Sequence, residues 1–338
     1  MTFDAHAHVI VPEITREAGG GEPWRPRVFR DDKDAQVVET GGREIRAAIS
    51  EFVDIEGILA AQDEAGVDRV LLCPWVPLLY YDAEPDDGLA RARIQNDALT
   101  GLVRANSDRV AALGALPLQD PELAAGELRA LMEAGVLKGV EVAASVRGVF
   151  LGDDRFEPFW AAAEASGALV FVHPTTRGFD SPAFQDYYLW NTVANPLETA
   201  VTAAHMVAAG LMERHPRLRV LLAHGGGALM AVRGRLRHAH GFQPQASARL
   251  SESPDDSIRR FYFDSLTHDD ELLRALIDYA GSERVLLGSD YPFDMGDARP
   301  ADAVRRLGLA PDVEAAILAG NAERLLGPRP ARREETIA

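Results

Sequence analysis

Residues 156–173, FEPFWAAAEASGALVFVH, contain the unit that decides the fold. The stretch 156–167 has the apolar spacing of an amphipathic helix and ends in Gly167, a common helix stop. Residues 168–173 follow at once as an apolar, β-rich run that ends in His173. Because this run is almost continuously apolar, it is typical of a parallel strand that is covered on both faces. The stretch therefore predicts a helix followed directly by a buried parallel strand.

The same alternation of helix and strand extends along the chain. Amphipathic segments at 54–66 and 121–135 also end in Gly shortly before an apolar run. We predict eight strands, at 2–9, 69–76, 109–116, 138–144, 168–173, 219–224, 260–265 and 284–290. Eight βα units in 338 residues predict an α/β fold of the (β/α)₈ TIM-barrel type. The count disfavours the main alternative, a doubly wound open sheet.

Two segments fall outside this repeat. Residues 12–52 contain the turn-rich run GGGEPW and the charged run DDKD. We expect here an insertion after the first strand, with turns and two short strands, that lies over one end of the barrel. Residues 328–338 are polar and rich in Pro and Arg, and they are expected to form a loosely ordered tail. The predicted organisation is one barrel over residues 1–327, including the insertion, followed by this tail.

The composition is that of a folded protein with an acidic surface. Apolar residues make up 47% of the chain, charged residues 26%, and the formal net charge is -17. This balance argues against nucleic acid or an anionic membrane as the main partner. The single cysteine, Cys73, excludes an intrachain disulfide. Because the chain also lacks a secretory pattern and an apolar run of the ~18–20 residues that span a bilayer, we predict a cytoplasmic location.

Polar side chains directly follow or interrupt the apolar runs of several predicted strands. The first strand carries His6 and His8, and later strands end in His173, His224 and Asp290. Functional residues of a barrel gather at the carboxyl ends of its strands. His6 and His8 share strand parity, so both side chains point to the same side. With His173 and Asp290 they would form a site with an open position for water, which suits Zn²⁺, with Mn²⁺ or Fe²⁺ as alternatives.

Further polar residues lie close to these ligands in the sequence. His224 precedes three glycines and a helix. This setting allows general acid/base catalysis, a fifth metal ligand or a phosphate cradle, and we favour the first. Asp264 and His268 follow the seventh predicted strand, and Asp264 is expected to hold the free N–H of a ligand imidazole. Asp4 has the same parity as the ligands in its strand and is expected to orient one of them.

Four motifs together resemble the amidohydrolase superfamily, in particular its aminocarboxymuconate semialdehyde decarboxylase-like branch: DAHAHV (4–9), FVHP (171–174), LLAHGGGA (221–228) and LLGSDYPF (286–293). The similarity extends from Phe3 to about Leu326. It implies a TIM barrel, usually a homodimer, with one Zn²⁺ per subunit on the four ligands above and His224 as the acid/base. Other superfamily members bridge two metals with a lysine. Lys138 opens the predicted fourth strand at the wrong end of the barrel, so the site should be mononuclear.

The resemblance also implies residues that bind the substrate. Arg46, in the insertion, aligns with a substrate-binding arginine, and Arg235 aligns with an arginine that reaches the neighbouring subunit's site. A lysine of the family is replaced by Thr40. The expected pocket also contains the aromatic side chains of Trp75, Tyr188, Trp190 and Phe293. With fewer cations than the family pattern, this pocket would favour a more aromatic or less charged substrate.

These observations support one leading function and two alternatives. The leading prediction is metal-dependent decarboxylation of a small unsaturated or aromatic carboxylic acid, with His224 or Asp290 delivering the proton. Arg46 and a partner subunit's Arg235 would hold the carboxylate. The same site would equally serve hydrolysis, hydration or ring closure of an amide, lactone or enol. A non-catalytic binding barrel is disfavoured, because such a protein would be expected to have lost part of the metal set.

Overall fold

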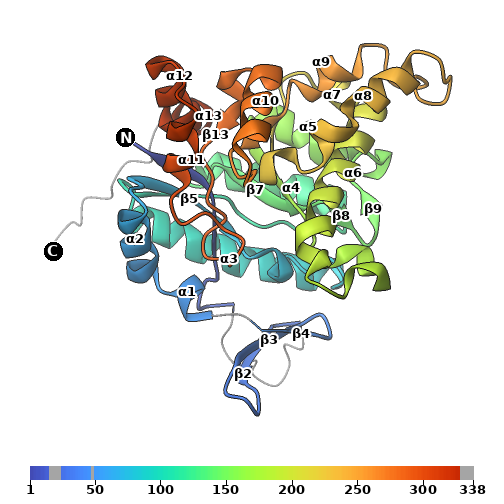
Figure 1. Ribbon diagram of the computed structural model, residues 1–338. Helices are drawn as coiled ribbons and strands as arrows, with labels where there is room; N and C mark the ends of the chain where they lie inside the picture. Colours follow the sequence, from blue (N-terminus) through green and yellow to red (C-terminus); the bar gives the residue numbers. More distant parts are fainter. Residues whose placement is uncertain (15–23, 47–48, 328–338) are drawn as a thin grey trace.

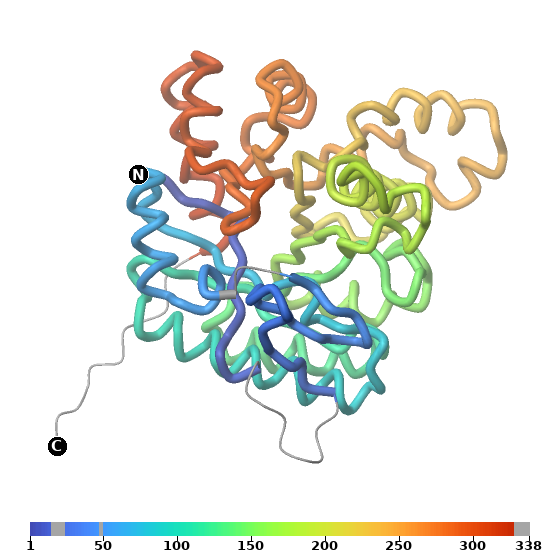
Figure 2. Tube along the Cα trace, turned by 60° about the horizontal axis from the view of Figure 1, so that its bottom comes forward, coloured from blue at the N-terminus to red at the C-terminus, as the bar shows by residue number. Residues whose placement is uncertain are grey.

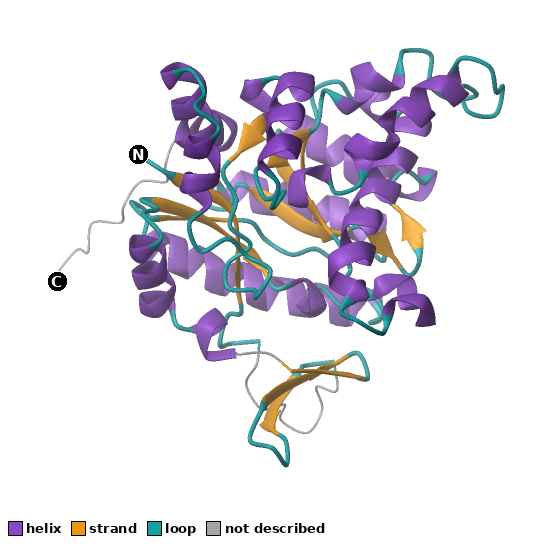
Figure 3. Ribbon diagram, in the orientation of Figure 1, coloured by secondary structure: helices purple, strands orange, loops and turns teal. Residues whose placement is uncertain are grey.

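Helices surround a central group of parallel strands in the computed structural model of the chain (Figures 1 and 3). The structure describes residues 1–14, 24–46 and 49–327. The tail expected at 328–338 lies outside the described residues, as does part of the insertion.

The central strands close into a ring. They are β1 (Phe3–Val9), β5 (Arg69–Pro74), β6 (Val110–Ala112), β7 (Gly139–Ala143), β10 (Leu169–His173), β11 (Arg219–Leu222), β12 (Tyr262–Asp264) and β13 (Val285–Leu286). They form two parallel sheets, ordered β1-β5-β6 and β13-β12-β11-β10-β7. Parallel bridges from Gly114 to Val140 and from Ala7 to Tyr291 join these sheets at both edges. The predicted TIM barrel is therefore confirmed.

Helices on the outside connect the strands, and local sequence sets their ends. The Asp120 side chain accepts a hydrogen bond from the Leu123 N–H at the start of α4. Gly135 and Gly167 end α4 and α5 with φ values of 72° and 67°. The helices are α2 (Ile55–Glu64), α3 (Pro85–Ala105), α4 (Pro121–Ala134), α5 (Glu157–Ser166), α6 (Asn195–Ala208), α7 (Leu211–Arg214), α8 (Leu229–His240), α9 (Pro254–Ile258), α10 (Asp270–Ala280), α11 (Pro300–Arg306), α12 (Pro311–Ala315) and α13 (Asn321–Leu326). Among the described residues, no helix has both the length and the apolar character that crossing a membrane requires.

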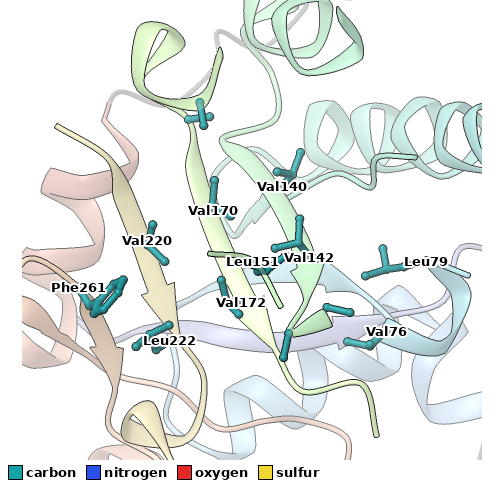
Figure 4. Close-up of a cluster of buried hydrophobic side chains, with 14 of the residues drawn as sticks. Val76, Leu79, Val140, Val142, Leu151, Val170, Val172, Val220, Leu222 and Phe261 are labelled. Atoms are coloured by element: carbon teal, nitrogen blue, oxygen red, sulfur yellow. The ribbon is translucent and has the colours of Figure 1, made fainter. Parts of the chain in front are cut away.

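Side chains alternate along the barrel strands between two apolar layers. Val170 and Val172 of β10 belong to the layer that packs between strands and helices (Figure 4). Phe171, between them, points into the barrel with the inner residues of the other strands. Ala322 and Leu325 of α13 complete this inner cluster together with residues such as Phe3 near the start of β1. The amino-terminal end of the barrel is therefore filled with apolar side chains, so a functional site is expected at the carboxyl end.

The described part of the insertion contains three strands where two were expected. They are β2 (Arg27–Arg30), β3 (Gln36–Thr40) and β4 (Arg43–Arg46), in one antiparallel sheet, and the helix α1 (Ile49–Val53) follows (Figure 1). Gly41 and Gly42, with φ values of 59° and 71°, form the tight turn that places Thr40 opposite Arg43. A side chain on Gly41 would collide with the Tyr80 ring, so the turn lies directly against the loop that follows β5. We call the β3–β4 pair with its turn the ribbon.

Candidate metal centre and adjoining cavity

Four side chains meet at the carboxyl ends of the barrel strands. His6 and His8 extend from β1, His173 ends β10, and Asp290 lies in the turn after β13. Their donor atoms lie within 4.8 Å of one another, and all four residues are buried. The structure therefore brings together the four predicted ligands, although most of the chain separates the first from the last. Figure 2 shows the blue N-terminal strand running through the body of the molecule beside later segments.

A β-bulge in β1 separates Asp4 from these ligands. The register of β1 against β5 shifts after Asp4, so Asp4 and His6 do not share a face. The Asp4 carboxylate instead accepts hydrogen bonds from the backbone and side chain of Ser289 and from Gln62 of α2. The expectation that Asp4 has the parity of the ligands was wrong, because the extra residue of the bulge reverses it. Asp4 therefore holds the segment just before Asp290 and also accepts a hydrogen bond from the backbone N–H of His6 at 3.0 Å, without contacting a ligand imidazole.

The nitrogens that face away from the centre indicate which tautomer each imidazole adopts. His6 Nδ1 lies 2.7 Å from an Asp264 oxygen, and His173 Nδ1 lies 3.0 Å from the Pro174 carbonyl oxygen. Both partners accept hydrogen bonds, so these Nδ1 atoms carry a hydrogen, and the Nε2 atoms face the centre, where each presents a lone pair when it is not protonated. His173 Nε2 is buried and has no hydrogen-bond partner among the described residues. Lone pairs that converge beside a carboxylate fit a bound divalent cation.

The charges of the centre shift the pKa values of its side chains. Burial lowers the pKa of His173 to about 3 and also lowers that of His8. Burial would lower the pKa of His6 too, but the charge of Asp290 and a hydrogen bond to Asp264 raise it well above its ordinary value. Burial would raise the pKa of Asp290, but His6, 3.0 Å away, keeps it well below its ordinary value. In the metal-free centre, a protonated His6 thus carries the positive charge that lies between Asp264 and Asp290.

Metal binding should therefore strengthen as the pH rises. The metal must displace the proton on His6, and the raised pKa of His6 means that this proton is still present at neutral pH. A lower pH makes the competing proton harder to displace. Calorimetric titration with Zn²⁺ in two buffers of different ionisation enthalpy, at about pH 6 and about pH 8, measures both affinity and proton release. Equal affinities with no released proton would contradict the role given to His6.

Asp264, at the end of β12, joins the metal centre to the glycine turn that follows β11. Its carboxylate accepts hydrogen bonds from the His6 ring and from the backbone N–H groups of His224 and Gly225, at 2.7, 2.8 and 2.8 Å. His224 and Gly225 have φ values of 57° and 60°, so the turn is tight. It holds His224 Nε2 3.3 Å from Asp290 Oδ2. The imidazole of His224 therefore lies beside the centre, within reach of a group that exchanges protons.

A cavity of about 610 Å³ lies at the carboxyl end of the barrel, and neither the four ligands nor His224 are among the described residues that line it. The loops that follow β5, β7 and β10 line it, together with the ribbon of the insertion. It reaches the ligand strands at Ala143, which pairs with His173 in the register of β7 and β10, and at Thr175. Its size and its position at the carboxyl end of a barrel suit a small molecule.

The charged side chains of this cavity are mostly paired. Arg177 contacts Asp82 and Asp180, each at 3.0 Å. Arg147 donates hydrogen bonds to backbone carbonyl groups of the loop after β5. Arg43, on the ribbon, has no acidic side chain or carbonyl paired with its guanidinium among the described residues. Partial burial and the charge of Arg177 lower the pKa of Arg43. The charges of Asp180 and Asp82 act on the Arg43 pKa in the opposite direction, so the wall formed by the ribbon presents a cation whose acidic neighbours lie beyond ion-pair distance.

Comparison with known proteins agrees with this centre. The family model described as amidohydrolase matches residues 3–327. The chain belongs to the amidohydrolase family. It is 34% identical over 337 residues to the 2-amino-3-carboxymuconate-6-semialdehyde decarboxylase of Dictyostelium discoideum, an alignment that covers 98% of this chain and 92% of that protein. The expected family and its aminocarboxymuconate semialdehyde decarboxylase-like branch are confirmed.

Solved structures share the fold of this amidohydrolase over nearly its whole length. The 5-carboxyvanillate decarboxylase from Sphingomonas paucimobilis matches with a TM-score of 0.80 and 27% identity, covering 96% of this chain and 98% of that chain. A dihydroxybenzoic acid decarboxylase from Polaromonas sp. JS666, solved with bound manganese, matches with a TM-score of 0.77 and 24% identity, covering 96% of each chain. The similarity therefore extends from the barrel into the insertion.

The structure of this amidohydrolase corrects the prediction for Arg46. Side chains alternate along a strand, and it is Arg43 and Ile45 of β4 that line the cavity. The Arg46 side chain is 67% exposed and pairs with Asp31 at 2.9 Å. Arg43 is therefore the arginine of this strand that faces the cavity.

Three of the predicted aromatic residues lie near the centre or beside one another. The Phe293 ring packs against the His8 ring, with their centroids 5.1 Å apart. The rings of Tyr188 and Trp190 pack against each other with their centroids 5.1 Å apart, and the Tyr188 hydroxyl donates a hydrogen bond to Asp294. Asp294 follows Phe293 in the turn that carries Asp290, so Tyr188 is tied to the same turn as a metal ligand.

The remaining predicted site residues make no hydrogen bond, ion pair or ring contact with the four ligands among the described residues. Trp75 is buried against Phe52 and is not among the described residues that line the cavity. Arg235 is exposed on α8, where it borders a separate, mostly apolar hollow. His268 is exposed and donates a hydrogen bond to the Met295 carbonyl group at 2.8 Å. Within one chain, the structure does not bring these three side chains to the centre.

Glu141, on β7, was missed by the sequence reasoning. It is fully buried, and its carboxyl group lies 3.8 Å from His8 Nδ1. Neither carboxyl oxygen has a hydrogen-bond partner among the described residues, and burial raises its pKa well above its ordinary value. One signal was present: a lone acid in the apolar run KGVEVAA, with the parity of Ala143, predicts a polar group that faces the barrel interior.

Proposed function

We propose that this amidohydrolase is a metal-dependent decarboxylase that acts on a small unsaturated or aromatic carboxylic acid. The observation that carries the proposal is the buried centre of three imidazoles and a carboxylate, with His224 beside it. A divalent metal bound there would supply a Lewis acid that polarises oxygens of the substrate. Relatives that are decarboxylases favour loss of CO₂ over hydrolysis, hydration or ring closure.

His224 supplies the proton that the reaction consumes. When the carbon–carboxylate bond breaks, its electron pair stays on the substrate carbon, and a proton must reach that carbon as CO₂ leaves. The His224 side chain is 17% exposed, so a small molecule can approach it from outside the barrel. One Asp290 oxygen faces His6 and His8, and the other faces His224. The oxygen that faces His224 can therefore stabilise the charged form of His224, while the oxygen that faces His6 and His8 stays among the metal ligands.

Aromatic rings beside the centre favour an unsaturated or aromatic substrate. The Phe293 ring lies between the His8 and Phe52 rings, at centroid distances of 5.1 and 5.3 Å. Flat apolar surfaces of this kind pack well against a conjugated ring or chain.

The metal, the assembly and the location form part of the same proposal. Three imidazoles and one carboxylate suit Zn²⁺, and Mn²⁺ and Fe²⁺ are the ions to test beside it. Arg235, exposed on α8, would reach the cavity of a second subunit in a homodimer. The single cysteine is buried and unpaired, which suits a reducing cytoplasm.

Release of CO₂ tests the reaction directly. Protein stripped with a chelator and reloaded with Zn²⁺, Mn²⁺ or Fe²⁺ is incubated with hydroxybenzoic acids, benzenedicarboxylic acids and unsaturated dicarboxylic acids. The expected result is metal-dependent release of CO₂ from at least one acid, with the stripped protein as the inactive control. Cleavage of amides or lactones without CO₂ would overturn the proposal and favour a hydrolase.

A further inference from the structure

His8 is the ligand imidazole that is held most weakly on the side facing away from the centre. Its Nδ1 atom lies 3.4 Å from the Pro74 carbonyl oxygen. The corresponding nitrogens of His6 and His173 lie only 2.7 and 3.0 Å from their acceptors. An N–H···O hydrogen bond is usually no longer than about 3.2 Å, so the Pro74 carbonyl group satisfies the N–H of His8 poorly.

The carboxyl group of Glu141 lies close to this N–H. Its Oε1 atom is 3.8 Å from His8 Nδ1, the side chain is buried, and neither oxygen has a hydrogen-bond partner among the described residues. Phe171, opposite Glu141 in the register of β7 and β10, points into the barrel, so Glu141 faces the same interior. A buried acceptor without a partner is costly. Donor and acceptor are only about 0.9 Å farther apart than the usual N–H···O separation of about 2.9 Å.

Two other polar side chains feel the charge of Glu141 without bonding to it. Burial and, to a lesser degree, that charge raise the pKa of the Cys73 thiol and of the Tyr81 hydroxyl. The Cys73 thiol faces the Leu71 carbonyl oxygen, and the Tyr81 hydroxyl has no hydrogen-bond partner among the described residues. In the part of the chain that the structure describes, His8 is the one basic side chain within ion-pair distance of Glu141.

We propose that Glu141 is a positioning residue for the metal, whose carboxyl group accepts the Nδ1 hydrogen of His8 when a divalent cation binds Nε2 of the same ring. This role rests on the proposed function only in requiring a divalent cation at the centre. A cation on Nε2 withdraws electron density from the imidazole, which makes its N–H a stronger donor and favours closing the gap to the acid. Asp264 already supports His6 in this way. Glu141 thus gives the second ligand of β1 the same kind of support.

Metal affinity and metal-free stability should respond differently to the loss of this carboxyl group. E141M introduces an apolar side chain of similar length. It should weaken Zn²⁺ binding, measured by competition with a chromophoric chelator, by about 10- to 100-fold. The Tm of the metal-free protein should stay the same or rise, because the buried carboxyl group that is removed has no hydrogen bond. A residue that only supports the fold would instead lower this Tm and leave the affinity unchanged.

Matched variants separate positioning from ligation. E141Q keeps an acceptor oxygen and should restore Zn²⁺ affinity to within about threefold of wild type. Y81F removes another buried hydrogen-bonding group without a partner and should bind Zn²⁺ as wild type does. If E141Q loses the metal as completely as E141M, Glu141 is itself a ligand and the proposal fails. An affinity of E141M equal to that of wild type would also overturn it.

A crystal structure of the Zn²⁺-loaded wild type tests the contact without any variant. His8 Nδ1 and Glu141 Oε1 should lie about 2.7–3.0 Å apart. A separation that remains near 3.8 Å would overturn the proposal. Since none of these measurements uses turnover, a failure to release CO₂ would refute the proposed function and leave the role of Glu141 standing.

Discussion

Replacing His224 with Asn should lower kcat for CO₂ release by about 10²- to 10⁴-fold while the protein keeps its metal. Asparagine is close to histidine in size, and the backbone N–H of residue 224 would still donate to Asp264, so the glycine turn should hold. The amide, however, cannot exchange a proton near neutral pH. The electron pair left on the substrate carbon would then wait for a proton from solvent. Turnover and metal content, measured on the same H224N sample, check this result.

The two measurements on H224N also separate the roles that the sequence leaves open for this residue. If activity and metal are lost together, His224 is a fifth ligand rather than the acid/base. An unchanged kcat with full metal content would remove His224 from the chemistry and leave proton delivery to Asp290. The position of Nε2, 3.3 Å from Asp290 Oδ2, favours retained metal with slow turnover.

The barrel could be predicted from the sequence because its pattern is local and repeated. Each strand is a short apolar run, and each helix has an apolar stripe and a stop such as Gly135 or Gly167. Where strand parity is regular, as from Leu169 to His173, side chains face the expected sides. The bulge in β1 breaks that parity at Asp4, and no residue type in DAHAHV marks where an extra residue is accommodated.

The metal ligands were predictable and the cavity was not, for a physical reason. The ligands lie on barrel strands or in the turn after one, and the carboxyl ends of these strands meet at one place in any closed barrel. The cavity wall is built by the ribbon, whose register against the barrel depends on the turn at Gly41 and its contact with Tyr80. Neighbouring residues of β4 face opposite sides, so a register shift of one residue would exchange the side chains that face the cavity with those that face solvent. In the observed register Arg43 faces the cavity and Arg46 faces solvent. Arg91, a buried residue of α3, donates a hydrogen bond to Thr40 of the ribbon, and nothing in the sequence marks that contact.

Replacing Asp290 with Asn should remove both the metal and the activity. The carboxylate is the acidic member of the four-ligand set, and one of its oxygens lies 3.0 and 3.1 Å from the Nε2 atoms of His6 and His8. An amide oxygen carries no charge, so the cation would lose its nearest negative partner in a buried site. Lewis-acid stabilisation worth several kcal/mol would be lost with the metal, and kcat should fall by about 10³-fold or more. Metal analysis after dialysis and an activity assay with excess Zn²⁺ measure the two effects.

D294N is the matched control for D290N, because Asp294 lies on the same turn and its carboxylate accepts a hydrogen bond from Tyr188 rather than from a ligand. It should keep one metal per chain. Full metal retention by D290N would mean that the three imidazoles suffice to hold the ion. The role of Asp290 would then be limited to proton transfer. Loss of metal by both variants would mean that metal binding depends on the conformation of the whole turn rather than on the Asp290 carboxylate. The expected difference follows from charge, since the pKa of Asp290 lies well below its ordinary value while it faces His6. That carboxylate is therefore a negative charge beside the ligand imidazoles at neutral pH, and the amide of D290N is never charged.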